Sequence, residues 1–205
     1  MCKEVFQIVE KMNLEELETQ MALQCAPLMA GIKISNLLIV QNSNVGDVEK
    51  ILEGTPITSD ILYQTSRKTT FLLYRASEVK NYLNTEKVKE AMHQFGYEKM
   101  DLPSVLKELS VRYHGYMSRR GEFPHELGLL LGYPVEDVLG FIENRGQNFL
   151  YTGYWKVYGN VDETVALFAR FERVKEQMIR MVSVGMDIPE ILQRFDNNYY
   201  GQLAV

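Results

Sequence analysis

The amino-acid sequence predicts an α+β fold that is mostly helical, with about eight helices around a small sheet of about three strands. Apolar residues recur at helical spacing along most of the 205 residues. Only three short segments have the apolar, β-branched or aromatic composition that is typical of strands. So few strands argue against a doubly wound nucleotide-binding sheet.

Composition predicts one domain over residues 1–205. The hydrophobic fraction is 46% and the charged fraction is 24%, which are ordinary values for a globular protein. No stretch is rich in Pro, Ser or Gly, so the sequence offers no linker. The length is sufficient for one well-buried core.

The first element expected is a helical pattern from Lys3 to Gln24. Asn13 and Glu16 resemble a capping box, so this region is either one kinked helix or two separate helices. A proline disfavours helical backbone in the residue before it and suits the first turn of a new helix. We therefore expect one helix to stop near Cys25 and a short one to begin at Pro27.

The middle of the chain alternates between short strands and helices. Strands are predicted by apolar and β-branched runs bounded by turn residues, and helices by periodic stripes that end at glycine. The predicted strands are 35–40 and 69–74, and the predicted helices are 47–52, 77–83, 85–95 and 102–119.

Residues 123–146 read as two short helices, opened by Pro124 and Pro134. Each helix carries an internal glycine, Gly128 in the first and Gly140 in the second. Glycine inside a helix costs about 1 kcal/mol relative to alanine, which indicates that something approaches closely at both positions. A neighbouring helix is the favoured explanation, and a ligand is the alternative.

Residues 149–158 alternate like a single strand, and this places Lys156 between Tyr154 and Tyr158 on one face. Such a lysine could bind an anionic group, could have a lowered pKa, or could protect a sheet edge with its stem packed on the rings. A long amphipathic helix follows, opened by Asn160 and Glu163. Its predicted inward residues are Val165, Phe168, Phe171, Met178 and Met181. A short helix around residues 188–195 ends the pattern.

Charge and hydropathy narrow the classes of partner. The net charge is −5, and the tightest basic cluster is only Arg119-Arg120, so we expect no nucleic-acid binding. No apolar run approaches the roughly 20 residues that span a bilayer, and no signal-peptide core is present, so we expect no membrane association. Two cysteines, one of them at the N-terminus, suit a reducing cytoplasm.

One catalytic hypothesis joins Cys25 as nucleophile to His125 as base, in a cysteine-dependent hydrolase or transferase. A cysteine just before a helix N-terminus has a stabilised thiolate, and Glu126 or Asp137 could orient the histidine. No zinc-protease spacing, Cys-x-x-Cys pair or phosphate-binding loop accompanies them, so no metal site is predicted and the commonest nucleotide-binding classes are disfavoured, while the identity of any cofactor stays open.

The favoured hypothesis is a binding or accessory protein for a small anionic ligand, a cofactor or a protein partner. Its site would form around His125 from lysines, tyrosines and one acid, namely Lys33, Tyr133, Asp137, Lys156 and Tyr158. A third alternative is a structural or homo-oligomeric role, which the C-terminal Tyr199 and Tyr200 suggest.

Two stretches of the chain carry a family resemblance. One is Cys25-Ala26-Pro27-Leu28-Met29-Ala30-Gly31-Ile32-Lys33. The other runs from Pro124-His125-Glu126-Leu127-Gly128 through Gly132-Tyr133-Pro134, Asp137-Val138 and Gly140-Phe141-Ile142 to Gly153-Tyr154-Trp155-Lys156-Val157-Tyr158. With these, the chain resembles the bacterial domain of unknown function 3793, typical of anaerobic Firmicutes. The resemblance implies a bacterial cytoplasmic protein and names no reaction.

Overall fold

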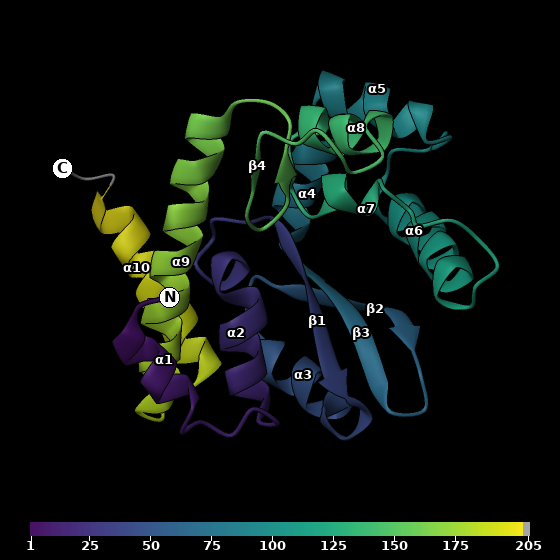
Figure 1. The fold of residues 1–205 in the computed structure, drawn as a ribbon. Coiled ribbons are helices and arrows are strands. Elements are labelled where there is room, and N and C mark those ends of the chain that lie inside the picture. The colour runs from purple at the N-terminus through teal and green to yellow at the C-terminus, as the bar shows by residue number, and fades with distance from the viewer. Residues whose placement is uncertain (203–205) are drawn as a thin grey trace. The chain divides into compact units, whose positions relative to one another are not determined.

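The computed structural model describes the backbone of residues 1–202 and the side chains of residues 1–196. It is 56% helical, with a three-stranded antiparallel sheet and a small two-stranded hairpin (Figure 1). These observations confirm the predicted α+β fold. Tyr199 and Tyr200, which suggested the structural alternative, lie outside the residues whose side chains are described.

The chain groups into two compact units, of which the first contains Met1–Tyr74 and the chain from Arg170 onward, and the second contains Arg75–Ala169. Helix α9 (Val161–Ser183) begins in the second unit and ends in the first. The single domain expected over residues 1–205 stays a prediction beside this grouping.

The first unit is built on the three-stranded sheet, in the order β1-β3-β2. Its elements are α1 (Lys3–Val9), α2 (Leu17–Met29), β1 (Ser35–Gln41), the 3₁₀ turn η1 (Asn42–Asn44), α3 (Val45–Leu52), β2 (Thr58–Gln64), β3 (Lys68–Tyr74) and α10 (Ile188–Gln202). Helix α2 lies along β1, where its buried residues meet Leu38, Val40 and Phe71 in the core (Figure 1). Two separate helices therefore occupy the region from Lys3 to Gln24.

The break expected at Cys25 is wrong, because α2 runs through Pro27 to Met29. Proline removes one helical hydrogen bond, but Cys25, Ala26, Leu28 and Met29 are all fully buried in this turn. The free energy gained by burying these four side chains outweighs the loss of one helical hydrogen bond. The helix ends soon after, where the Lys33 N–H donates to the Pro27 carbonyl at 3.0 Å.

Strand β2 was not predicted from the sequence. It lies at an edge of the sheet, most of its residues are exposed or half-buried, and a register shift falls between Ile61 and Tyr63. An exposed and irregular edge strand lacks the alternating pattern on which strand prediction depends. The third predicted strand was instead placed at 149–158, in the other unit.

The second unit is a group of helices with the hairpin. Its elements are α4 (Ala76–Leu83), α5 (Glu86–Gln94), α6 (Leu102–Met117), α7 (Leu127–Leu130), α8 (Val135–Glu143), β4 (Tyr151–Thr152), β5 (Lys156–Val157) and the start of α9. Asp101 caps α6 by accepting the Ser104 N–H at 3.0 Å. The predicted helices of this region all occur, with shifted ends.

The single strand predicted over 149–158 is wrong, because this segment turns back on itself. Thr152 pairs with Lys156, and the Gly153 N–H donates to the Trp155 carbonyl at 3.1 Å across the turn. Tyr154 therefore sits in the turn, and strand alternation does not place it on one face with Lys156 and Tyr158. Val165 of α9, predicted to face inward, is 37% exposed.

Among the described residues, the structure contains no helix with the length and apolar character needed to cross a membrane.

Candidate binding surface around Lys156

The hairpin is held against α8 by the buried carboxylate of Asp137, which is only 3% exposed. One oxygen, Oδ2, accepts the indole N–H of Trp155 at 2.7 Å. The other, Oδ1, accepts the backbone N–H groups of Tyr158 at 2.7 Å and Gly159 at 3.0 Å. Three donors satisfy a charge that would otherwise be costly to bury. Asp137 thus positions the hairpin.

Tyr133 packs against the ring of Trp155. The two rings are stacked, with centroids 4.5 Å apart and planes at 25°. Trp155 also meets Phe168 edge-on, at 4.5 Å and 85°. The Tyr82 hydroxyl donates to the Tyr133 carbonyl at 3.0 Å, and burial raises the pKa of the Tyr133 hydroxyl. The structure therefore brings Tyr133 and Asp137 together through Trp155.

The two internal glycines mark close packing. A Cβ added at Gly128 would lie 2.9 Å from Val138 Cγ2, so the neighbouring helix α8 is what approaches there. A Cβ at Gly140 would lie 2.7 Å from the Cβ and Cγ of Tyr158. The predicted approach of a neighbouring helix is confirmed at Gly128 and is wrong at Gly140, whose neighbour Tyr158 follows the hairpin and lies in no helix.

Lys156 reaches from β5 to the C-terminal end of α8. Its Nζ donates to the Gly146 carbonyl at 2.6 Å. The ammonium also lies 4.8 Å from the centroid of the Phe149 ring and 5.8 Å from that of Phe141. A cation over aromatic faces and beside the carbonyl end of a helix is favourable on both counts.

A row of aromatic contacts continues from this lysine through Phe141 of α8 and the segment between α6 and α7 to the end of α6. His125 lies between two rings, 5.5 Å from Phe141 and 5.3 Å from Phe123. Phe123 meets Tyr116 edge-on at 5.1 Å. We call this row the aromatic strip; it comprises Tyr116, Phe123, His125, Phe141, Lys156 and Phe149.

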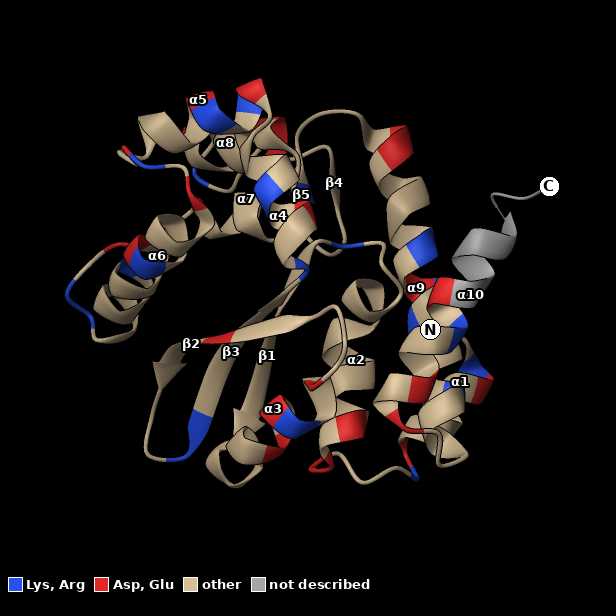
Figure 2. Ribbon diagram, turned by 180° about the vertical axis from the view of Figure 1, so that it is seen from behind, with Lys and Arg blue, Asp and Glu red and all other residues tan. Residues whose placement is uncertain are grey.

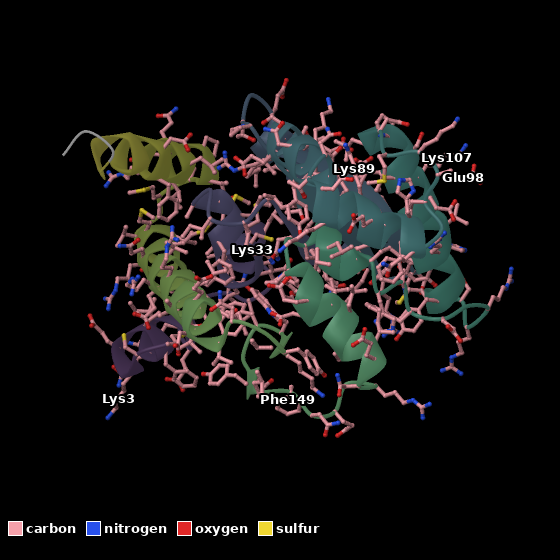
Figure 3. All side chains as sticks on the ribbon, turned by 90° about the horizontal axis from the view of Figure 1, so that it is seen from above. Lys3, Lys33, Lys89, Glu98, Lys107 and Phe149 are labelled. Carbon is pink, nitrogen blue, oxygen red and sulfur yellow. The ribbon has the colours of Figure 1, made fainter. Side chains whose placement is uncertain are left out.

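The aromatic strip is exposed to solvent at both ends, and His125, Phe141 and Lys156 between them are half-buried. Tyr116 and Phe123 are each 40% exposed, and Phe149 is 38% exposed. Figure 3 shows Phe149 at the edge of the molecule in that view, among outward-pointing side chains. Leu150, next to it, is 65% exposed. Contiguous exposed apolar side chains of this kind are typical of interaction sites.

The two acids that could orient His125 are engaged elsewhere. Asp137 accepts the three hydrogen bonds of the hairpin. Glu126 is 2% exposed and accepts from Tyr97 Oη and Arg112 Nη1, both at 3.1 Å. These acids stabilise the second unit, and the contacts described above for His125 are with the rings of Phe123 and Phe141.

Cys25 and Lys33 belong to the first unit, where they share one neighbour. Lys33 Nζ donates to Asn36 Oδ1 at 2.7 Å, and Asn36 Nδ2 lies 3.7 Å from Cys25 Sγ. Cys25 is fully buried, and this burial raises the pKa of its thiol to about 12. Burial also lowers the pKa of Lys33 to about 8.

The expected activation of Cys25 by a helix N-terminus does not apply, because the residue lies inside α2. His125 lies in the second unit. The dyad of Cys25 and His125 therefore joins different units and stays a prediction, as does the inclusion of Lys33 in one site with Lys156.

A second surface feature lies in the first unit, where an open cleft of about 560 Å³ occurs between the starts of α2 and α3. Asp47 in its wall is paired with Lys50 at 3.0 Å. Its lining is Asn13, Glu15, Glu16, Leu17, Glu18, Gln41, Ser43, Asn44, Asp47, Lys50 and Ile51. None of the predicted site residues lines this cleft. Across the described residues, no group of three or more His, Cys, Asp and Glu is arranged to hold a metal ion.

Residues 21–192 match the family described as "Protein of unknown function (DUF3793)", and the chain belongs to this family. The matched region contains both stretches that suggested the resemblance, from Cys25 to Lys33 and from Pro124 to Tyr158. No curated protein and no solved structure matches the chain.

Proposed function

We propose that this member of the DUF3793 family is a binding or accessory protein that holds its ligand or partner on the aromatic strip. The observation that carries the proposal is the ammonium of Lys156, held over the rings of Phe141 and Phe149 within a row of aromatic side chains that is exposed at both ends. The partner would combine an apolar surface with negative charge.

The chemistry of the strip suits such a partner. Exposed rings offer apolar area at low cost in conformational entropy, because aromatic side chains have few rotatable bonds. Lys156 offers a charge whose position is defined by Gly146 and two rings, so that little freedom is lost when an anion is bound. Apolar contact supplies affinity, and the ammonium supplies preference for an anion.

The enzyme alternative lacks comparable support within the first unit. A nucleophilic cysteine needs an accessible thiolate, and Cys25 is fully buried with a thiol pKa raised to about 12. As part of the proposal, we place the protein in the cytoplasm, since Cys2 and Cys25 are both free thiols.

The test uses 8-anilinonaphthalene-1-sulfonate, a probe that joins aromatic rings to a sulfonate. We expect its fluorescence to rise on binding to the native protein, and the single tryptophan, Trp155, to report the event by energy transfer. The double variant Phe149→Ser, Lys156→Gln should weaken binding of the probe by about tenfold or more, because one apolar contact and one ion pair are lost together.

The matched control is Lys107→Gln, an exposed lysine of the same unit that lies far from Phe149 in Figure 3. It should bind the probe like the unchanged protein. Equal binding by all three proteins, each shown to be folded by circular dichroism, would contradict the proposed function.

A further inference from the structure

We infer that the partner of the aromatic strip is an acidic peptide segment of another protein, one that carries aromatic or large aliphatic side chains between its carboxylates. This inference rests on the proposed function and adds the class of partner. Three observations support it, concerning unpaired cations, the backbone at two arginines, and the acids that lie among them.

The strip is bordered by cations without carboxylate partners. Arg119 and Arg120 follow the end of α6 beside Tyr116, and Arg145 precedes Gly146, whose carbonyl accepts from Lys156. Among the residues described, none of these three arginines or Lys156 is in an ion pair. The chain as a whole has a net charge of −5, so this is a local excess of positive charge.

Two of these arginines occupy positions that favour glycine. Arg119, after α6, has φ 57°, and Arg145, after α8, has φ 52°. Left-handed backbone at the end of a helix is the usual place of glycine, and a side chain there costs free energy, which the helix dipole offsets only in part. Arginine at both of these left-handed positions, despite the cost in free energy, is expected where the side chains contact a partner.

Two acids lie among the cations. Glu122 stands between Arg120 and Phe123, and Glu143 is the last residue of α8, close to Arg145. In Figure 2 the loop after α6 is blue and then turns red toward α7, which shows this mixture. A uniform polyanion would be repelled at both acids. A peptide can place its carboxylates opposite the arginines and neutral residues opposite Glu122 and Glu143.

The apolar part of the partner would lie on the rings. Tyr116 and Phe123 form one end of the strip and Phe149 the other, with His125 and Phe141 between them. Leu150 and Tyr151 extend the surface beyond Phe149, being 65% and 42% exposed. An elongated surface of this kind fits an extended segment, whose side chains can reach successive rings.

The experiment is a selection from a display library of random peptides of about 12 residues, which span roughly 40 Å when extended. The full chain is the target, and the double variant Phe149→Ser, Lys156→Gln removes peptides that bind elsewhere. We expect the retained peptides to be enriched in Asp and Glu together with Phe, Trp or Leu. No enrichment, or enrichment in neutral or basic peptides, would overturn the inference.

Two further variants separate binding from folding. In Arg119→Gly and Arg145→Gly, the backbone strain is relieved while the charge is lost, so we expect unchanged or higher thermal stability and about tenfold weaker binding of the selected peptides for the pair combined. Lys107→Gln should change neither the thermal stability nor the binding of the selected peptides. Undiminished affinity in the arginine pair would contradict the role given to these cations.

Other classes of partner are tested with the same pair of proteins. Single-stranded RNA, vesicles containing phosphatidylglycerol, and the protein itself in sedimentation equilibrium are measured against the unchanged protein and the double variant. Strip-dependent binding of any of these, without acidic peptides, would overturn the inference and leave the proposed function standing. If the probe 8-anilinonaphthalene-1-sulfonate also binds the double variant as tightly as the unchanged protein, the proposed function fails as well.

Discussion

Asp137 and Trp155 are joined by a hydrogen bond of 2.7 Å from the indole N–H to a carboxylate oxygen, and both residues are buried. This bond connects α8 to the hairpin that carries Lys156. Because Trp155 is the only tryptophan of the chain, its fluorescence reports directly on this connection. The aromatic strip depends on it, since Phe141 belongs to α8 and Lys156 to the hairpin.

Asp137→Asn is expected to destabilise the second unit by about 2–3 kcal/mol, because a charged acceptor is lost and the new amide cannot accept from all three donors. Urea unfolding followed by Trp155 fluorescence and by circular dichroism measures this change. Glu143→Gln, at an exposed position of the same helix, serves as the control. If Asp137→Asn unfolds at the same urea concentration as the unchanged protein, Asp137 does not position the hairpin.

Gly140→Ala should cost about 1–3 kcal/mol, since the new methyl group would lie 2.7 Å from Tyr158 Cβ and Cγ, and overpacking outweighs the better helix propensity. Gly115→Ala in α6 is the matched substitution, because nothing lies within 4 Å of its Cβ position. It should stabilise the protein by about 0.5–1 kcal/mol. Thermal unfolding of both variants measures whether their stabilities change in opposite directions. Two changes in the same direction would contradict the close approach of Tyr158 to Gly140.

Cys25 should resist alkylation in the folded protein. With a thiol pKa of about 12, roughly one ten-thousandth of Cys25 is thiolate at about pH 8, and burial excludes the reagent as well. Iodoacetamide should therefore modify the exposed Cys2 first and Cys25 only upon unfolding. Peptide mapping by mass spectrometry measures both rates. Rapid modification of Cys25 in the native protein would restore the nucleophile hypothesis.

Because of Lys33, the free energy of unfolding is expected to rise with pH. Burial lowers its pKa in the folded state to about 8, from an ordinary value of 10.5, so that between these values the unfolded state binds more protons. The free energy of unfolding should then increase by about 1 kcal/mol between about pH 7 and pH 9, relative to Lys33→Met. This window lies mostly below the range of about 9 to 12 in which the raised pKa of Cys25 lowers stability.

Urea titrations of the unchanged protein and Lys33→Met across this pH range measure the difference. Lys107→Gln should run parallel to the unchanged protein, because Lys107 is exposed. Parallel curves for Lys33→Met would show that Lys33 keeps its charge at no cost in the folded state.

Much of the helical fold could be predicted from local pattern. The helices from Ala76 to Met117 and the strands β1 and β3 have apolar spacing or strand composition strong enough to locate them. The errors occur where local rules conflict with burial or with pairing. At Pro27 the burial of a whole turn overrides the proline, and in 149–158 a turn at Gly153 and Tyr154 replaces one strand with two.

Of the predicted site residues, Lys156 and His125 belong to the proposed aromatic strip, whereas Tyr133 and Asp137 hold the hairpin in place. Four rings of the aromatic strip were missed, since no sequence spacing relates Tyr116 and Phe123 to Phe141 and Phe149. Asp137 was predicted to orient His125 or to line a binding site, whereas its carboxylate accepts from Trp155, Tyr158 and Gly159, which lie more than 15 residues away.

The sequence by itself determined the α+β class, most of the helices, the family, and the absence of an apolar run that could span a bilayer, because each of these depends on composition or on neighbours within a few turns. Only the tertiary structure decided that Cys25 is buried, that Gly140 makes room for Tyr158, and that Lys156 lies over two rings. These relationships join residues distant along the chain, and packing alone brings such residues into contact.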